Sequence, residues 1–291
     1  MKIFVTGGSG FIGRHLIREF EDNQILVLAR AKPVWSSSAR ADWLVGDLDQ
    51  TDLWESRLID FSPDVCIHLA WEGLPDYSNE ISEKNVQLSA NLLSTLQRTE
   101  VKKIVALGSC WEYGDAHGQV LETQDVKPNS HFAAAKVQVC EMFSAKCSSA
   151  GVSFVWPRIF FSYGPGQRDV ALLPTVAAAL ENDELPTIKS PDSAQDFIYI
   201  SDVVRAIAST ATTANVEGIF NVGSGQLTQI GDFANLVSTQ LGSTFRVDVS
   251  GDPLGLYASI DKLKNVVGWE PRYTVQHGVT ETIKALKKQL F

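Results

Sequence analysis

The stretch Thr6–Gly13, TGGSGFIG, decides the fold of this 291-residue chain. It follows the apolar run Lys2–Thr6, which has the character of a buried strand, and it opens the segment Gly10–Phe20, which has helical character. A glycine-rich turn gains its meaning from this context, because the turn then faces the N-terminus of a helix. The stretch therefore predicts a strand–turn–helix unit that binds the phosphates of a dinucleotide.

Each glycine of this loop has its own physical role in such a site. Gly7 permits the tight turn, Gly10 lets the backbone approach the pyrophosphate, and Gly13 lets the helix pack closely against the strand. The free amides and the positive dipole at the helix N-terminus attract the phosphate groups. The predicted cofactor-binding residues of the loop are Gly7, Gly10, Phe11, Ile12 and Gly13.

The end of the second predicted strand, Gln24–Ala29, bears on the choice of cofactor. Enzymes that use NAD usually place an acidic residue there, about 20 residues past the loop, to bind the ribose 2′-hydroxyl. Here the strand is followed by Arg30, with Lys32 close behind and no carboxylate nearby. A cation suits the 2′-phosphate of NADP, so we predict NADP (NADPH) as the cofactor, with NAD less favoured. The alternative is that Arg30 is a solvated loop residue.

The first half of the chain alternates short apolar runs with longer amphipathic ones, as parallel strands joined by helices do. We predict strands at Lys2–Thr6, Gln24–Ala29, Asp42–Val45, Val65–Leu69, Lys103–Leu107 and Ser153–Trp156. We predict helices at Gly10–Phe20, Ile81–Gln97 and Phe132–Ser149. The fold class is therefore α/β: a Rossmann-type doubly wound parallel sheet with a smaller, mixed α/β C-terminal lobe.

After about Phe161 the alternation of apolar and amphipathic runs becomes less regular, and prolines separate shorter elements. We predict a dinucleotide-binding domain at residues 1–160 and a substrate-binding lobe at residues 161–291. The segments near residues 195–225 again have the character of strand and turn, so we expect them to return to the first domain.

Composition restricts the class of partner. The formal net charge of −9 argues against a general binder of nucleic acid or anionic membranes. The four cysteines show neither a CxxC pair nor a metal-ligand spacing, so we expect reduced thiols and no metal. The strand begins almost at Met1, which leaves no room for a signal peptide, and no apolar run has the roughly 20 residues needed to cross a bilayer. We expect a soluble, cytoplasmic protein.

The sequence resembles the extended short-chain dehydrogenase/reductase family, in its NAD-dependent epimerase/dehydratase group, whose members act on nucleotide sugars. The matching segments occur in the family's order: TGGSGFIG, GDL (Gly46–Leu48), VCIHLAW (Val65–Trp71), NVQLSANLL (Asn85–Leu93), LGSCWEYG (Leu107–Gly114), PRIFFSYGPGQ (Pro157–Gln167), QDFIYISDVVRAI (Gln195–Ile207), FNVGSG (Phe220–Gly225) and GWEP (Gly268–Pro271).

The resemblance implies roles for several residues of the cofactor site. Asp47 and Leu48 would contact the adenine, Leu69 would line the cofactor cleft, and Lys136 would hold the nicotinamide ribose. For Asp47 the alternative is a carboxylate that caps a turn.

The resemblance also implies a catalytic group, and here the chain departs from the family. Members pair a Ser or Thr with Tyr-x-x-x-Lys; Ser109 matches the hydroxyl, although it could instead cap the following turn. The chain reads HFAAAK, with Lys136 in register and Phe132 in place of the tyrosine. Loss of a general acid–base group typically removes about 10²–10⁴ in rate.

Three explanations fit this substitution. The first is a deliberate change that disables a tyrosine enzyme, the second is a native enzyme with another proton donor, and the third is a protein that binds ligand without catalysis. We favour the first, because Ser109, Lys136 and the glycine loop all match the chemistry. The donors nearest in sequence are Tyr113, His131 and Cys110.

The same motifs indicate which of the family's reactions fits this chain. Dehydratases of the family carry an Asp-Glu pair directly after the Ser or Thr, where this chain has Cys110-Trp111. Epimerases usually carry an Asn in an R-x-x-N stretch, where this chain has Phe161. What remains resembles the reductases that convert a nucleotide-linked 4-keto-6-deoxy sugar to its 4-hydroxy product with NADPH. The predicted substrate-binding residues are Trp71, Tyr113 and Arg168.

Alternatives stay open for the residues and for the function. Trp71 is otherwise a core residue and Arg168 a solvated one. A nucleotide-sugar 4-epimerase with tightly bound NAD and a non-catalytic binding protein are the other functional readings. The helices Ile81–Gln97 and Phe132–Ser149 resemble the pair through which the family forms dimers, so we expect a homodimer.

Overall fold

A computed structural model describes residues 1–35 and 41–288 of the protein. Within these residues, the largest element is an eight-stranded sheet in the order β12-β8-β5-β4-β1-β2-β3, with β6 beside β8. All of its neighbouring strands pair in parallel. The strands are β1 (Lys2–Thr6), β2 (Gln24–Ala29), β3 (Asp42–Val45), β4 (Val65–His68), β5 (Lys103–Ala106), β6 (Gly108–Ser109), β8 (Ser153–Ile159) and β12 (Gly218–Val222).

The predicted fold class is confirmed, and the strand order shows where a ligand would bind. The chain builds the sheet outward from β1 in both directions, so the order reverses between β1 and β4. In open α/β sheets, ligands bind in the crevice outside the carboxyl ends of the strands at such a switch point. The glycine loop directly follows β1 and therefore lies at this position.

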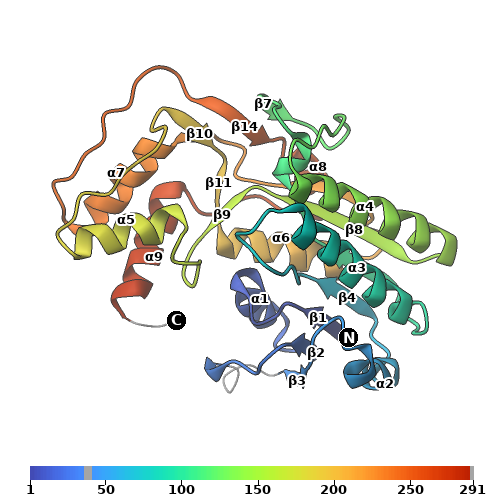
Figure 1. The fold of residues 1–291 in the computed structure, drawn as a ribbon. Coiled ribbons are helices and arrows are strands. Elements are labelled where there is room, and N and C mark those ends of the chain that lie inside the picture. Colours follow the sequence, from blue (N-terminus) through green and yellow to red (C-terminus); the bar gives the residue numbers. More distant parts are fainter. Residues whose placement is uncertain (36–40, 289–291) are drawn as a thin grey trace.

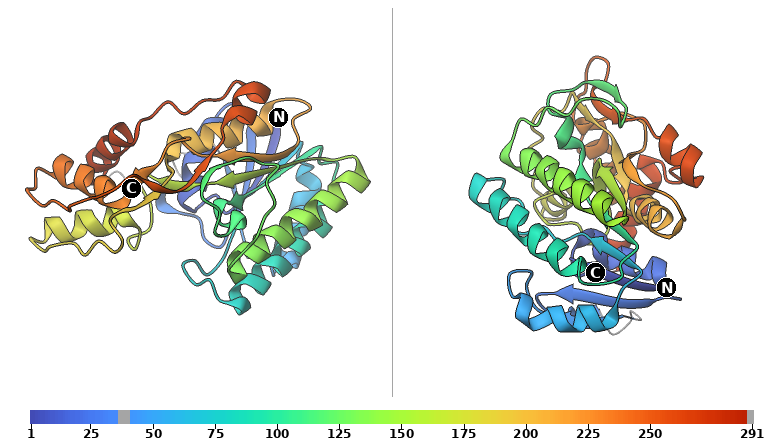
Figure 2. Two further views of the ribbon diagram at one scale, coloured as in Figure 1. Left: turned by 90° about the horizontal axis from the view of Figure 1, so that it is seen from above. Right: turned by 90° about the vertical axis from the view of Figure 1, so that its right-hand side faces the viewer.

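Helices cover both faces of the sheet (Figures 1 and 2). The two-residue period of the strands divides the core accordingly. Ile3 and Val5 belong to a cluster with α1 and α6, whereas Phe4 belongs to a cluster with α2, α3 and α4. These helices are α1 (Phe11–Leu16, continued by the 3₁₀ turn η1, Ile17–Phe20), α2 (Thr51–Phe61), α3 (Asn79–Leu96), α4 (His131–Ala150) and α6 (Ile200–Thr212).

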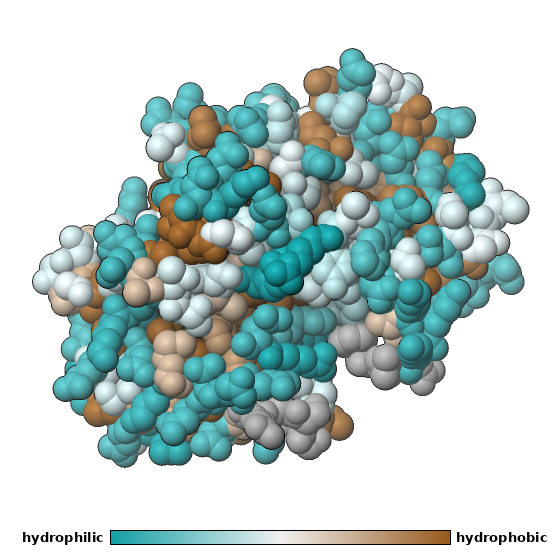
Figure 3. Space-filling model, turned by 180° about the vertical axis from the view of Figure 1, so that it is seen from behind, coloured by the Kyte–Doolittle hydropathy of each residue, from teal (hydrophilic) through white to brown (hydrophobic). Residues whose placement is uncertain are grey.

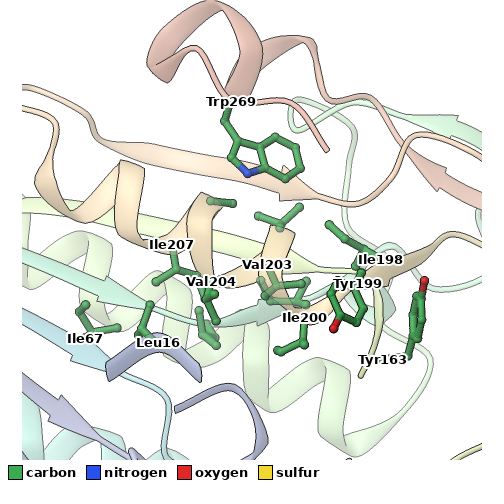
Figure 4. Close-up of a cluster of buried hydrophobic side chains, with 14 of the residues drawn as sticks. Leu16, Ile67, Tyr163, Ile198, Tyr199, Ile200, Val203, Val204, Ile207 and Trp269 are labelled. Atoms are coloured by element: carbon green, nitrogen blue, oxygen red, sulfur yellow. The ribbon is translucent and has the colours of Figure 1, made fainter. Parts of the chain in front are cut away.

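Helix α6 shows how the first cluster is filled. Its buried side chains Ile200, Val203, Val204 and Ile207 recur at helical spacing and face the sheet (Figure 4). Leu16 of α1 belongs to the same cluster, so α1 is packed from its inner side while its N-terminus stays at the crevice.

The remaining elements lie outside the main sheet and the helices named above, and α5, α7 and α9 gather together at one end of the molecule (Figure 1). One small sheet has the order β13-β10-β14-β7, and β11 pairs with β9 in another. The strands are β7 (Gly118–Val120), β9 (Phe161–Tyr163), β10 (Ser193–Gln195), β11 (Phe197–Tyr199), β13 (Thr228–Gln229) and β14 (Leu254–Ala258). The helices are α5 (Leu172–Glu181), α7 (Ile230–Leu241), α8 (Asp261–Val267) and α9 (Val275–Lys287), and η3 is a 3₁₀ turn at Cys110–Tyr113.

Most predicted strands and helices match the structure to within two residues, and two differ by more. The helix predicted at Gly10–Phe20 ends as an α-helix at Leu16 and continues as a 3₁₀ turn. The strand predicted to end at Trp156 extends to Ile159. Pro157 is tolerated there because pairing with β5 ends at Val155 and pairing with β6 begins at Arg158.

Figure 3 shows the face of the molecule opposite that of Figure 1. This face is mostly hydrophilic, with hydrophobic residues in separate patches (Figure 3). No helix in the described ranges is long and apolar enough to span a bilayer.

One buried carboxylate ties the main sheet to the small sheets. Asp196 lies between β10 and β11 and is fully buried. Its Oδ1 accepts hydrogen bonds from the backbone N–H and the hydroxyl of Ser224, at 2.6 Å each. Its Oδ2 accepts from the backbone N–H groups of Gly225 and Ala258, at 3.0 Å each. The carboxylate therefore links the loop after β12 to the end of β14.

Replacement of Asp196 should destabilise the fold strongly, because its carboxylate accepts four hydrogen bonds. Asp196→Ala leaves three backbone N–H groups, one of them fully buried and two partly buried, without their acceptor, at about 1–3 kcal/mol each. We expect the free energy of unfolding to fall by about 3 kcal/mol or more, measured by urea denaturation followed by circular dichroism. The control is the exposed Asp248→Ala, for which we expect a change within about 0.5 kcal/mol. A loss below about 1 kcal/mol for Asp196→Ala would contradict this account.

Candidate active site

A cavity of about 150 Å³ opens at the carboxyl ends of β1, β2 and β4. The glycine loop, the end of β2 and the loops after β3 and β4 form its walls. Among the residues predicted to bind the cofactor, those that line it are Gly7, Gly10, Arg30, Asp47, Leu48 and Leu69. The predicted substrate residue Trp71 lines it too, as does Glu72, which sequence reasoning missed.

The glycine loop is a backbone cradle that admits no side chain at two of its positions. Gly7 has φ +70°, and a Cβ there would lie 2.6 Å from the backbone N of Ala70. A Cβ at Gly13 would lie 2.4 Å from the carbonyl oxygen of Gly7, which accepts a hydrogen bond from Gly10 N at 3.0 Å. No acidic residue stands in the first turn of α1. This geometry fits the phosphates of a dinucleotide.

A buried histidine fixes the loop after β4. His68 Nδ1 lies 2.7 Å from Thr6 Oγ1, and His68 Nε2 lies 3.0 Å from Ser89 Oγ. Burial lowers the pKa of His68 to about 3, so the ring is neutral at physiological pH. Thr6 Oγ1 also accepts from Ala70 N at 3.3 Å. This chain of contacts holds β1, α3 and residues 69–72 in one arrangement.

Charged side chains occupy the part of the cleft beside β2. The side chain of Arg30 is 72% exposed, and its Nη1 lies 3.8 Å from Glu72 Oε1. Glu72 Oε2 lies 2.6 Å from Lys84 Nζ. Burial and the nearby charge of Glu72 raise the pKa of Asp47. Burial alone would raise the pKa of Glu72, but Lys84, the hydrogen bond with Asp47 and Arg30 together bring it below its usual value.

Next to Trp71, which lines the cleft, the amino group of Lys136 is buried. Lys136 Nζ donates to the carbonyl oxygen of Leu107 at 2.8 Å and lies 3.8 Å from the centroid of the Trp71 ring. Burial lowers the pKa of Lys136 to about 7, and the charge of Glu112 opposes that shift. Ser109 follows Leu107 by two residues, and its Oγ accepts from Trp111 N at 3.2 Å.

The ring of Phe132 is surrounded by those of Trp71, Tyr77 and Trp111. These four rings are here called the aromatic cluster. The centroid of the Phe132 ring is 5.4 Å from those of Trp71 and Tyr77 and 5.6 Å from that of Trp111. The contacts are edge-to-face, the arrangement that aromatic pairs favour. Lys136 Nζ lies 5.8 Å from the Phe132 centroid. The structure thus brings Phe132, Lys136 and Trp71 together as predicted candidates, and adds Tyr77 and Trp111.

Glu112 has a structural role next to Ser109. It is fully buried, and its Oε1 accepts from the backbone N–H of Ser109 at 2.8 Å and from Trp156 Nε1 at 3.0 Å. Its Oε2 accepts from Arg158 Nε at 2.7 Å. The carboxylate therefore fixes the turn that carries Ser109.

The other predicted residues lie away from this group. Tyr113 is 1% exposed and donates its hydroxyl to Asn221 Oδ1 at 2.7 Å, so the prediction that it contacts substrate has no support in this geometry. The corresponding prediction for Arg168 also lacks support, because Arg168 is exposed in the loop before α5 and lines none of the cleft. As donors, Cys110 is buried with a raised pKa and His131 is exposed at the start of α4.

Comparisons with known proteins agree with this geometry. The sequence profile of the "NAD dependent epimerase/dehydratase family" matches residues 3–223. An uncharacterized UDP-glucose epimerase of Bacillus subtilis is 26% identical, with 98% of each chain covered. A dTDP-4-dehydro-6-deoxyglucose reductase of Escherichia coli is 23% identical, covering 98% of this chain and 97% of the relative.

A solved structure shows the same fold. The UDP-glucuronic acid 4-epimerase of Bacillus cereus, in complex with UDP-glucuronic acid and NAD, superposes with a TM-score of 0.88 at 22% identity and covers all of both chains. The resemblance on which the sequence analysis relied is therefore confirmed. The chain belongs to the NAD dependent epimerase/dehydratase family, whose members are nicotinamide-dependent enzymes of the extended short-chain dehydrogenase/reductase type.

Proposed function

We propose that this protein reduces a nucleotide-linked 4-keto-6-deoxy sugar to its 4-hydroxy product with NADPH. The aromatic cluster beside Lys136 carries the proposal, because apolar rings suit the methyl group and the C–H faces of a deoxy sugar. The Escherichia coli reductase among the relatives supports it. The two residues directly after Ser109 do not form an acid–base pair for the elimination of water, since Cys110 is buried with a raised pKa and Trp111 belongs to the cluster.

In the proposed reaction, different residues bind different parts of the cofactor. The glycine loop, with Phe11 and Ile12 beside it, holds the phosphates, while Asp47, Leu48 and Leu69 enclose the adenosine half. The cofactor, when bound, supplies the hydride that adds to the keto carbon.

The sugar oxygen then needs a proton and a positioned donor. Ser109 donates a hydrogen bond to that oxygen, Lys136 holds the nicotinamide ribose, and Trp71 packs against the sugar. Phe132 fills the place of the family's tyrosine but has no proton to give, so water must supply the proton for the sugar oxygen and the proposed activity of this chain is low.

Phe132→Tyr tests the assignment directly. The change places a phenol one helical turn before Lys136, and we expect turnover to rise by about 10² or more. The affinity for the sugar should change little, because one hydroxyl is added to a ring already in place. Turnover is measured as NADPH oxidation at ~340 nm, with a panel of nucleotide-linked keto sugars.

Ser109→Ala in the Phe132→Tyr protein is the control, and it should lower turnover again because the keto oxygen loses a donor. If the unchanged protein already turns over briskly and Phe132→Tyr adds nothing, the proton comes from another group. If neither form reduces any keto sugar although both bind NADPH, the reductase assignment is wrong and a non-catalytic binding protein is the better reading.

The cofactor preference has its own test. Arg30 stands where NAD enzymes usually carry a carboxylate, so we expect NADPH to bind at least about tenfold more tightly than NADH, or about 1.4 kcal/mol. Titration of each nucleotide, followed by quenching of tryptophan fluorescence, measures the ratio. Equal affinities or a preference for NADH would overturn the role of Arg30.

The assembly is proposed to be a homodimer. Helices α3 and α4 pack side by side along one face of the molecule (Figures 1 and 2), which suits a four-helix interface with a second copy. We expect a dimeric mass by light scattering at micromolar concentration, and a monomeric mass would count against the interface.

A 4-epimerase of a nucleotide sugar is the second candidate, favoured by the position of Glu72 beside Arg30 in the cleft. Such an enzyme would keep NAD tightly bound and interconvert its substrate without added reductant. The absorbance spectrum of the purified protein separates the two readings, because copurified NAD would be visible there.

A further inference from the structure

We propose that Glu72 is a specificity-determining residue of the cofactor cleft, which weakens the binding of a 2′-phosphorylated dinucleotide by holding Arg30 and facing the adenosine ribose. The proposal rests on the proposed binding of a dinucleotide in this cleft. Sequence patterns give no reason to single out this residue, because the acidic residue that reads the ribose usually ends the second strand.

The position of Glu72 is fixed by its main chain. Its backbone N–H donates to Asn85 Oδ1 at 2.7 Å, and its carbonyl oxygen accepts from Asn85 Nδ2 at 3.1 Å. Asn85 is buried and also donates to the carbonyl oxygen of Ile81 at 2.8 Å. The side chain of Glu72 is 15% exposed. These contacts clamp the residue to α3, so its carboxylate enters the cleft from a defined point.

The carboxylate belongs to a cluster of four charged groups. Lys84 is its nearer partner at 2.6 Å and Arg30 its farther one at 3.8 Å, and Asp47 is close enough to influence its pKa. Arg30, Asp47 and Glu72 line the same cavity. Because its pKa lies below the usual value, Glu72 is charged at neutral pH.

This arrangement acts in opposite directions on the two cofactors. A ribose 2′-hydroxyl can donate to a carboxylate, whereas a 2′-phosphate is repelled by it. The 2′-phosphate is attracted by Arg30, but the pairing of Arg30 with Glu72 reduces the charge available to it. Glu72 therefore opposes, from the loop after β4, part of the preference for NADPH that Arg30 gives.

The experiment compares the affinities of the full-length protein for NADPH and NADH by titration. Glu72→Gln keeps the size of the side chain and removes its charge. We expect the ratio of NADPH affinity to NADH affinity to rise about tenfold or more, mainly through tighter binding of NADPH. The matched control is Glu80→Gln, which removes the same charge from an exposed position on α3 and should change the ratio less than about twofold.

A second variant separates the charge of Glu72 from its place in the loop. Arg30→Ala added to Glu72→Gln should bring the ratio back down, because the released cation is gone. An unchanged or lowered ratio in Glu72→Gln, or an equal loss of affinity for both nucleotides, would overturn the role of Glu72. Failure of every variant to bind either nucleotide would overturn the cofactor site itself, whereas failure to reduce keto sugars leaves the measured ratio as a valid test.

Discussion

The candidate active site depends on the burial of one carboxylate, that of Glu112. Removing an ion pair from water is costly unless its hydrogen bonds are complete. Here Arg158, Trp156 and the backbone of Ser109 all donate to the carboxylate, whereas Nη1 of Arg158 is buried without a hydrogen-bond partner among the described residues. Gly108 makes the approach possible, because a Cβ there would lie 2.5 Å from Glu112 Oε1. The ion pair thus joins β8 to the turn that carries Ser109. The buried carboxylate of Glu112 in this way fixes the position of the Ser109 hydroxyl.

The same carboxylate makes the burial of Lys136 tolerable. The aromatic rings around Lys136 Nζ exclude water and lower its pKa to about 7, while Glu112 acts in the opposite direction. Near neutral pH the amino group is therefore divided between its charged and neutral forms. A charged Lys136 would lower the pKa of a phenol at position 132, but it has no such effect on the phenylalanine present. The electrostatic conditions for acid–base catalysis thus persist beside a side chain that cannot use them.

The sequence predicted what depends on neighbours along the chain, and it failed where distant contacts decide. The central strands could be predicted because burial on both faces gives continuous apolar runs. Gly7 and Gly13 could be predicted because the tight turn and the close packing of α1 leave no room for a side chain. The prediction that Tyr113 contacts substrate gains no support, because the hydroxyl of Tyr113 bonds to Asn221 on β12. Glu72 was missed because Asn85, thirteen residues later, sets its position.

Two consecutive residues, Trp71 and Glu72, join the cleft to the neighbouring group around Lys136. The side chain of Trp71 covers Lys136 at the end where hydride transfer is proposed, and Glu72 reaches Arg30 at the end where the adenosine is proposed to bind. Both follow the His68 contacts that tie β1 to α3. A displacement of this short loop would therefore move an aromatic wall of one half and a charged wall of the other together. The proposed cofactor site and the proposed sugar site therefore share one backbone segment, residues 69–72.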